Sequence, residues 1–272
     1  MTRETRISAA DRVLAYGAET HPVLQRELEN IDVQLRSRYA MQSNQAAVGL
    51  LDLRTSRVAM VHPDRCEYGA SVPKIGILLA YFALRPDAAT NLDPGTRHQL
   101  GLMIKRSSNE TASKFSHELG LKQIQEVLNR LGLYQAQQGG GIWVGKHYGE
   151  EGERYVDPVG EHSHAITVRQ ALRYFLLLET GKLLSAAASQ AMREIFQSPE
   201  IPHDQIKFVK GLAGREVEII RKWGSWEDWL HDVAVVTGPR RHYILAGLTH
   251  HPRGDDYLAD LAGIVDDLLA RD

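Results

Sequence analysis

The sequence predicts an α+β protein whose antiparallel sheet is built from strands at both ends of the chain and is flanked by the terminal helices. Apolar, strand-like runs occupy residues 46–62 and 217–249, each interrupted by turn residues. The long segment between them, residues 71–202, shows the periodicity of helices instead. Strands grouped apart from helices are typical of α+β architecture, so we expect an all-helical subdomain inserted into the sheet layer.

The first expected elements are a helix and a β-hairpin. The helix covers residues 22–39, because Pro22 suits a first helical turn. Its apolar residues at helical spacing are Leu24, Leu28, Ile31 and Leu35. Two strands are expected over residues 46–53 and 57–62, since both runs are apolar and the turn-like residues 52–56 separate them.

Several helices are expected in the middle of the chain. One follows Ser71, and two more cover residues 119–131 and 167–178. Ser185 is expected to cap a fourth, because serine side chains accept hydrogen bonds from the first turn of a helix. Residues 139–164 open with three glycines and are expected to form a loop. Loops of this length inside a compact domain are usually functional or disordered.

The last third of the chain returns to strands and ends in a helix. The expected strands are residues 217–223, 232–237 and 243–249. We interpret residues 1–272 as a single domain, with an α/β part over about 20–70 and 206–272 and a helical part over about 71–205. The seam between the two parts is the expected place for a pocket.

Composition and charge exclude several classes of function. The 272 residues carry a net charge of −2, so no basic field attracts nucleic acid or anionic lipid. The single cysteine, Cys66, cannot form an internal disulfide and is expected to fill apolar space. No apolar run is long enough to span a membrane, and the N-terminus does not read as a secretory signal. We therefore expect a cytoplasmic protein, or a periplasmic or secreted one if an export signal was removed.

The first chemical motif is Ser71-Val72-Pro73-Lys74. Pro73 is tolerated only in the first turn of a helix, so the helix is expected to begin near Ser71. Lys74, three residues later, then lies on the same face as Ser71. A lysine that is partly buried loses its proton more readily, and its neutral amine can take the hydroxyl proton of Ser71.

The second motif is Ser107-Ser108-Asn109, in a polar break between helices. A hydroxyl at Ser107 can pass a proton to a leaving group, and the amide of Asn109 can hold a substrate carbonyl.

The third motif is Lys222-Trp223-Gly224-Ser225, at the end of a predicted strand. Lys222 can orient an anionic group, and Gly224 permits close approach of a ligand to the backbone. The backbone N–H of Ser225 can serve with that of Ser71 as an oxyanion donor.

Together these motifs resemble the Ser-x-x-Lys, Ser-Asp-Asn and Lys-Thr-Gly signature of class A β-lactamases and penicillin-binding proteins. The resemblance covers almost the whole chain and implies that fold and an acyl-enzyme mechanism without metal or other cofactor. It implies that Ser71 is acylated, with Lys74 as its base either directly or through water, and that Ser107 protonates the leaving nitrogen. Asn109 would bind the substrate amide, and Lys222 would attract a substrate carboxylate. The implied substrate is a small molecule: a β-lactam or a related amide.

Three positions depart from the family pattern. Ser108 replaces the aspartate of the second motif, and Trp223 replaces the threonine of the third. The change to Trp223 removes a hydroxyl that family members use for carboxylate binding. Leu230 falls near the position where many members carry a carboxylate-binding arginine.

The Ω-loop, here residues 139–164, departs most. Class A enzymes carry a Glu-Pro-x-Leu-Asn pattern whose glutamate activates the deacylating water, and that pattern is absent. The acids available in this loop are Glu150, Glu151, Glu153, Asp157 and Glu161. Counting back from Thr167 points to Glu150 or Glu151, and we assign Glu151 to the role. Without such a base the acyl-enzyme would accumulate, as in a penicillin-binding protein.

Other functions compete with this interpretation. A metallo-hydrolase would need His162, His164, His250 or His251, but these pairs lack the spacing of a metal site. No Gly-x-Ser-x-Gly sequence indicates a Ser-His-Asp hydrolase. A hydrolase of another ester or amide, or a non-catalytic binding module with Trp223 filling the pocket, remains open. The binding module is disfavoured because the chain keeps together the five residues Ser71, Lys74, Ser107, Asn109 and Lys222.

Overall fold

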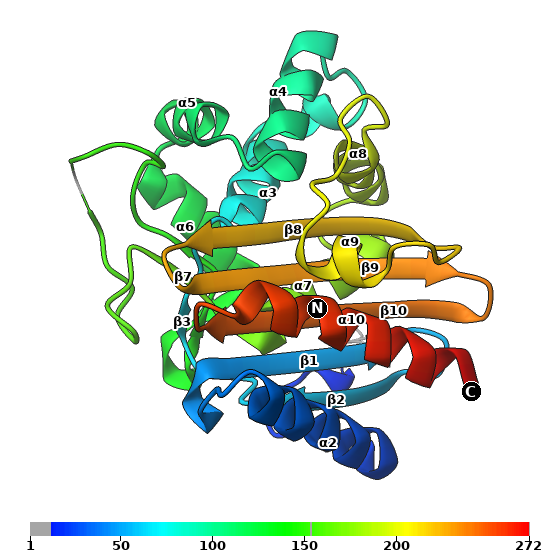
Figure 1. Ribbon diagram of the computed structural model, residues 1–272. Helices are drawn as coiled ribbons and strands as arrows, with labels where there is room; N and C mark the ends of the chain where they lie inside the picture. The colour runs from blue at the N-terminus through cyan, green and yellow to red at the C-terminus, as the bar shows by residue number, and fades with distance from the viewer. Residues whose placement is uncertain (1–11, 153, 272) are drawn as a thin grey trace, which may run out of the picture.

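The main sheet joins strands from the two ends of the chain (Figure 1). The computed structural model describes residues 12–152 and 154–271. The five antiparallel strands lie in the order β2-β1-β10-β9-β8. Their bounds are β1 Ala46–Asp52, β2 Arg57–Val61, β8 Glu218–Trp226, β9 Trp229–Gly238 and β10 Arg241–His250. Strand β1 is paired with β10 along the whole length of β1, with Leu50 opposite Leu245. The α+β prediction is confirmed.

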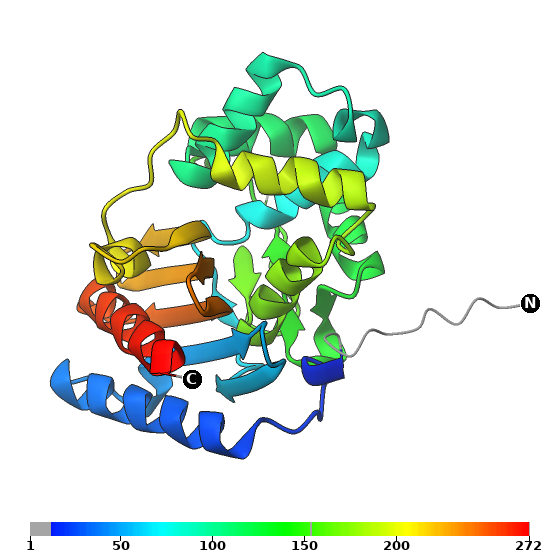
Figure 2. The ribbon, with the colours of Figure 1, turned by 90° about the vertical axis from the view of Figure 1, so that its right-hand side faces the viewer.

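The helices lie in two groups, one on each side of the sheet (Figure 2). Helices α2 (Pro22–Arg38), α9 (Lys207–Gly211) and α10 (Gly254–Arg271) cover one face. The helices of the other side are α3 Lys74–Leu84, α4 Pro94–Lys105, α5 Asn109–Leu119, α6 Leu121–Arg130, α7 Val168–Glu179 and α8 Ala186–Gln197. Separate apolar cores fill the two sides, as expected for a sheet that buries both faces.

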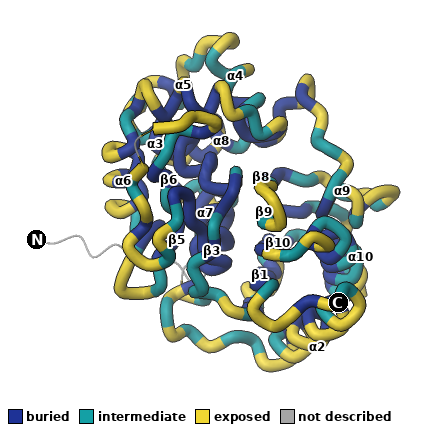
Figure 3. Tube along the Cα trace, turned by 60° about the vertical axis from the view of Figure 1, so that its left-hand side comes forward, coloured by how far each residue is buried: buried dark blue, intermediate teal, exposed yellow. Residues whose placement is uncertain are grey.

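Short elements complete the second side. The short strands are β3 Glu67–Tyr68, β4 Tyr134–Gln135, β5 Gly140–Gly141, β6 Trp143–Val144 and β7 His164–Ile166. The 3₁₀ turns are Ser43–Gln45, Pro86–Ala89 and Ala136–Gln138. Figure 3 shows that α3 and α7 are buried along most of their length. An apolar helix buried on all sides provides a rigid support for the residues at its first turn.

Several boundaries differ from the sequence prediction, each for a local reason. Strand β8 runs to Trp226 and β9 begins at Trp229, so both strands extend into the predicted connection and the turn between them is only two residues long. Gly120, with φ of 80°, separates α5 from α6, so the predicted helix over 119–131 begins only at Leu121. The Ω-loop contains short strands because β6 pairs with β7. The predicted Ser185 cap is confirmed, since its side chain accepts from the N–H of Ala188.

Candidate active site

Ser71 lies in a tight turn just before α3. The backbone N–H groups of Lys74, Ile75 and Gly76 each bond to the carbonyl three residues earlier. This pattern makes the entry to α3 3₁₀-like, so the regular helix begins at Lys74 instead of Ser71. Ala70 adopts φ of 46°, a left-handed conformation that is costly for a residue with a side chain. Strain of this kind is concentrated at functional sites.

Lys74 is fully buried and connects the first two motifs. Its ammonium lies 3.0 Å from Ser71 Oγ and 2.7 Å from Asn109 Oδ1. It also donates to the carbonyl of Ser107 at 2.7 Å and lies 3.3 Å from that residue's Oγ. Burial lowers the pKa of Lys74 to about 7, because desolvation penalises the charged form. A substantial share of the molecules therefore carries a neutral amine beside Ser71 near neutral pH.

Ser107 is held between two lysines. Lys222 Nζ donates to Ser107 Oγ at 2.9 Å, from the side of the sheet. Ser107 itself has φ of 57°, so its hydroxyl and its carbonyl both face Lys74. The neighbouring Ser108 caps α5 by accepting from the N–H of Thr111 at 3.2 Å. Ser108 therefore performs a structural role that an aspartate could also perform.

Strand β8 packs directly against the turn that carries Ser71. A side chain at Gly224 would place its Cβ 2.8 Å from the backbone nitrogen of Ser71 and 3.1 Å from that of Val72. Only glycine fits at this distance, which leaves the end of β8 beside the first turn of the nucleophile. Lys222 is buried on the same strand, and burial together with the charge of Lys74 lowers its pKa well below the usual range.

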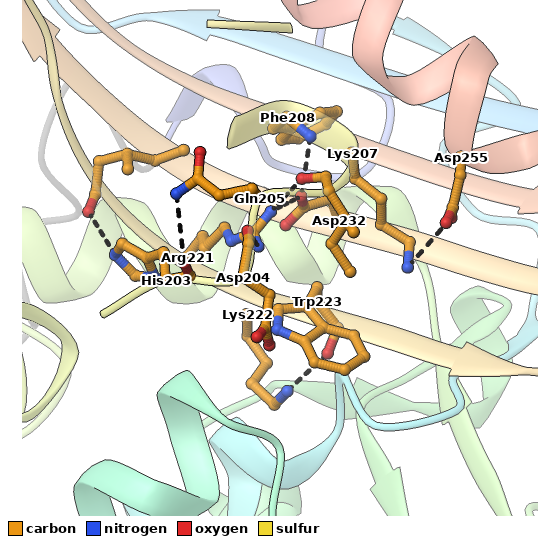
Figure 4. A network of polar contacts seen from close by, with 12 residues as sticks. His203, Asp204, Gln205, Lys207, Phe208, Arg221, Lys222, Trp223, Asp232 and Asp255 are labelled. Atoms are coloured by element: carbon orange, nitrogen blue, oxygen red, sulfur yellow. Dashed lines mark hydrogen bonds and ion pairs between the residues drawn. The ribbon is translucent and has the colours of Figure 1, made fainter. Parts of the chain in front are cut away.

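A buried polar network supports the end of β8 (Figure 4). Arg221 and Asp232 form an ion pair of 2.6 Å between two fully buried side chains. Arg221 also donates to the carbonyls of Asp204 and Ile206, and Asp232 accepts from the N–H of Phe208. These bonds fix the conformation of residues 204–208.

This segment carries Lys207, which the sequence analysis did not single out. Lys207 is buried with φ of 52°, and its Nζ donates to Ser225 Oγ at 2.6 Å. It also pairs with Asp255 at 3.1 Å and lies 5.0 Å from the centre of the Trp223 ring. The indole of Trp223 is contacted by Lys222 at the same distance on the other side. A positive charge therefore lies directly behind the hydroxyl of Ser225.

The Ω-loop contributes two stacked rings to the site. Tyr148 donates to the carbonyl of Ala70 at 3.0 Å, and Lys74 Nζ lies 4.4 Å from the centre of its ring. His164 stacks on Tyr148 with ring centres 4.0 Å apart. Burial, assisted by the charge of Lys74, lowers the pKa of His164 to about 3, so its imidazole is neutral. The sequence analysis considered His164 only as a candidate metal ligand and did not assign Tyr148 to the site, because nothing local in the sequence distinguishes these rings from ordinary core aromatics.

A pocket of about 600 Å³ opens at the seam between the sheet and the helices. Ser71, Asn109 and Ser225 line it together with Tyr148 and His164. The seam is where the sequence analysis expected a pocket.

The Ω-loop acids differ in their surroundings. Asp157 is buried and accepts from Tyr134 Oη and from three backbone N–H groups, so it holds the loop together. Glu150 bonds to Ser113 and, at 2.9 Å, to His117. Glu151 is exposed on the pocket wall, and within the described residues it has no hydrogen-bond partner.

Among the described acids of this loop, Glu161 does not line this pocket. Glu161 is exposed and has φ of 56°. Glu153 lies outside the described residues.

The histidines and the cysteine of the rival interpretations have other surroundings. No three His, Cys, Asp or Glu side chains among residues 12–152 and 154–271 come together as a metal-binding group. His250 stacks on Trp229, with ring centres 3.8 Å apart. Burial raises the pKa of the Cys66 thiol to about 12, which makes it a poor nucleophile. Among the described helices, none is long and apolar enough to cross a membrane.

A sequence profile described as "Beta-lactamase enzyme family" matches residues 90–269, which is more than half of the chain. The chain belongs to the β-lactamase enzyme family. The matched segment includes the motifs at Ser107 and Lys222 but begins after Ser71 and Lys74. Family membership supports a serine hydrolase that acts on small molecules. A comparison with curated protein sequences finds no significant match.

Solved structures of this family share the fold at low sequence identity. The β-lactamase from Sphaerobacter thermophilus superposes with a TM-score of 0.68 at 16% identity, over 89% of this chain and 97% of that one. A class A β-lactamase from Mycobacterium abscessus gives 0.69 at 15% identity, over 90% and 99%. A structure of PBP-A gives 0.65 at 17% identity, over 89% and 96%. The resemblance inferred from the motifs is confirmed at the level of family and fold.

Proposed function

We propose that this protein opens a β-lactam or a related amide through an acyl-enzyme on Ser71. The observation that carries the proposal is the buried chain of contacts from Ser71 through Lys74 and Ser107 to Lys222. A buried amine with a pKa of about 7, hydrogen-bonded to a hydroxyl, is the arrangement that a general base requires.

In the proposed acylation, neutral Lys74 takes the hydroxyl proton as Ser71 Oγ forms a bond to the substrate carbonyl carbon. The carbonyl oxygen becomes an oxyanion, which the backbone N–H groups of Ser71 and Ser225 stabilise. The carbon–nitrogen bond then breaks, and Ser107 gives its proton to the leaving nitrogen. Ser107 recovers a proton from Lys74 through the 3.3 Å contact between them, while Asn109 holds the substrate amide.

Lys207 supports recognition of an anionic group on the substrate. Because Lys207 donates to Ser225 Oγ, the proton of that hydroxyl is free to point into the pocket. The charge of Lys207 strengthens such a bond. Ser225 therefore supplies a hydroxyl donor for a substrate carboxylate, although Trp223 lacks the hydroxyl that the family's threonine provides.

Turnover requires water to attack the acyl-enzyme, and we propose Glu151 as the base that activates it. Stalled turnover, as in a penicillin-binding protein, is the second candidate function. The observation that favours it is that Glu150 and Asp157 are engaged in holding the loop, while Glu151 is exposed to solvent.

The test is intact-protein mass spectrometry with nitrocefin or a fluorescent penicillin, with colour followed in parallel. Rapid colour with little adduct would support β-lactam hydrolysis, and a persistent adduct would support the penicillin-binding alternative. In Ser71→Ala we expect no adduct, and in Lys74→Ala we expect acylation to slow by about 10²- to 10⁴-fold. Labelling that survives in Ser71→Ala would contradict the mechanism. If the wild-type protein gives neither colour nor adduct, the remaining candidates are a hydrolase of another ester or amide and a binding module.

A further inference from the structure

Four aromatic rings form one wall of the pocket that contains Ser71. They are Tyr68, His162, Trp226 and Trp229, which we call the aromatic wall. Tyr68 lies at its centre, with the other three ring centres 5.3 to 6.0 Å away in edge-on contacts. Trp226 is 51% exposed, which is unusual for a residue with the largest apolar side chain.

The aromatic wall is held in position before any ligand binds. His231 is fully buried and contacts the carbonyl of Tyr68 at 2.7 Å through Nε2. Its Nδ1 accepts from the N–H of Thr249, so Nε2 carries the proton and donates to Tyr68. Trp229 stacks flat on His250, and it is paired with Trp226 across the β8–β9 turn. Rigid exposed rings lose little entropy when a ligand covers them.

The position of the aromatic wall assigns it to the acyl side of the substrate. Trp226 directly follows Ser225, whose backbone N–H is the proposed donor to the acyl carbonyl. The leaving group, in contrast, departs toward Ser107, and Ser107 does not line this pocket within the described chain. A group attached to the acyl carbon beside Ser225 would therefore extend over Trp226.

We propose that the aromatic wall binds a planar aromatic ring on the acyl part of the substrate. The inference rests on the proposed acylation of Ser71 and adds the class of acyl group that the site prefers. Aromatic rings favour edge-to-face and offset stacked contacts with one another, and the edge-on arrangement around Tyr68 leaves the Trp226 ring free to make such a contact. The preference belongs to these side chains, so it is independent of how fast the acyl-enzyme is hydrolysed.

The test compares 4-nitrophenyl esters of phenylacetic, cyclohexylacetic and acetic acid. In each, Ser71 Oγ forms the new bond to the acyl carbon, and 4-nitrophenolate leaves and is measured. We expect the wild-type protein to react fastest with the phenylacetyl ester. In Trp226→Ala that advantage should fall by about 10-fold or more, while the rate with the acetyl ester stays within about twofold. Leu84→Ala removes another exposed apolar side chain, at the end of α3, and should change neither rate.

The outcomes separate this inference from the proposed function. A Ser71 adduct with equal rates for all three esters, or an equal loss for all three in Trp226→Ala, would overturn the aromatic wall alone. If no ester releases 4-nitrophenolate and none labels Ser71, the proposed function fails, and binding decides the inference. Saturation-transfer NMR of phenylacetamide with Ser71→Ala should then show contact through the phenyl protons, and Ser71→Ala/Trp226→Ala should lose it. Absence of that signal in the single variant would also overturn the aromatic wall.

Discussion

At the scale of single residues, the burial of Lys74 determines how the site responds to pH. Its pKa of about 7 means that the neutral amine becomes the main form as pH rises through 7. We expect the acylation rate to increase about 10-fold between pH 6 and a plateau above pH 8. Stopped-flow measurement with nitrocefin checks this, and Lys74→Ala should lose the step. A rate that is flat from pH 6 to 8 would argue against Lys74 as base.

The same burial affects stability in a predictable direction. The folded protein releases the Lys74 proton near pH 7, whereas an exposed lysine keeps its proton until about pH 10.4. The unfolded chain therefore binds more protons over this window. The cost of burying Lys74 falls as the pH rises from about 7.

Gly224 provides a second test at the residue scale. A Cβ there would collide with the backbone of the Ser71 turn, so Gly224→Ala should move β8 away from the nucleophile. We expect acylation to slow by about 100-fold or more, because small displacements in a catalytic site have large effects. Gly95→Ala is the matched control, since its Cβ would meet only a side-chain oxygen of Asp93. Equal rates in the two variants would show that the close approach of β8 is unimportant.

Glu151 is tested by separating the two half-reactions. Glu151→Gln should leave acylation unchanged but slow hydrolysis of the acyl-enzyme by about 10²- to 10⁴-fold, so the adduct accumulates. Mass spectrometry after mixing and dilution measures this decay. Glu150→Gln, whose carboxylate is engaged with Ser113 and His117, serves as the neighbouring control. If Glu151→Gln turns over like the wild-type protein, another group activates the water.

At the scale of elements, the support of β8 depends on the buried pair of Arg221 and Asp232. Asp232→Asn leaves the Arg221 charge buried without its partner and should lower the free energy of unfolding by about 3–5 kcal/mol. Urea unfolding followed by circular dichroism measures the loss. Asp256→Asn breaks only exposed pairs with Arg253 and Lys210, so about 1 kcal/mol or less is expected. Similar losses in both variants would indicate that burial of the pair does not matter.

The elements also show what sequence patterns can and cannot predict. Helix α2 and strands β1 and β2 were predicted closely, because apolar spacing and turn residues are local signals. The end of β8 was placed too early and the start of β9 too late, because Trp226 and Trp229 lie beside charged turn residues and were interpreted as loop. Their pairing depends on the register between two strands, which a pattern within one strand does not contain.

The candidate site divides in the same way. Ser71, Lys74, Ser107, Asn109 and Lys222 could be selected because they occur as short motifs in a fixed order. Lys207, Tyr148 and His164 reach the site only through folding, and no spacing relates them to Ser71. Asp157 could be taken for a catalytic acid from its loop position, but the loop folds around its carboxylate.

At the scale of the whole molecule, the site exists only where the two layers meet. Ser71 and Ser107 come from the helical side, directly before α3 and α5, whereas Lys222 and Ser225 come from strand β8 of the sheet. The aromatic wall likewise combines Tyr68 with the β8–β9 turn and with His162 of the Ω-loop. The geometry of the pocket therefore depends on how firmly the sheet and the helical layer are packed together, and the close approach at Gly224 lies on that seam beside Ser71.

The pairing of β1 with β10 has a consequence for the order in which the protein can form during synthesis. Strand β1 leaves the ribosome long before its partner β10, which begins at Arg241. Pairings this distant in sequence form slowly, because the chain loses the entropy of closing a long loop before the paired strands stabilise it. Until then β1 has β2 as its neighbour within the main sheet. Ser71 also lacks strand β8, which carries the proposed oxyanion donor at Ser225. The nascent chain thus carries its reactive serine without the means to use it until strands β8 to β10 have been synthesised and paired.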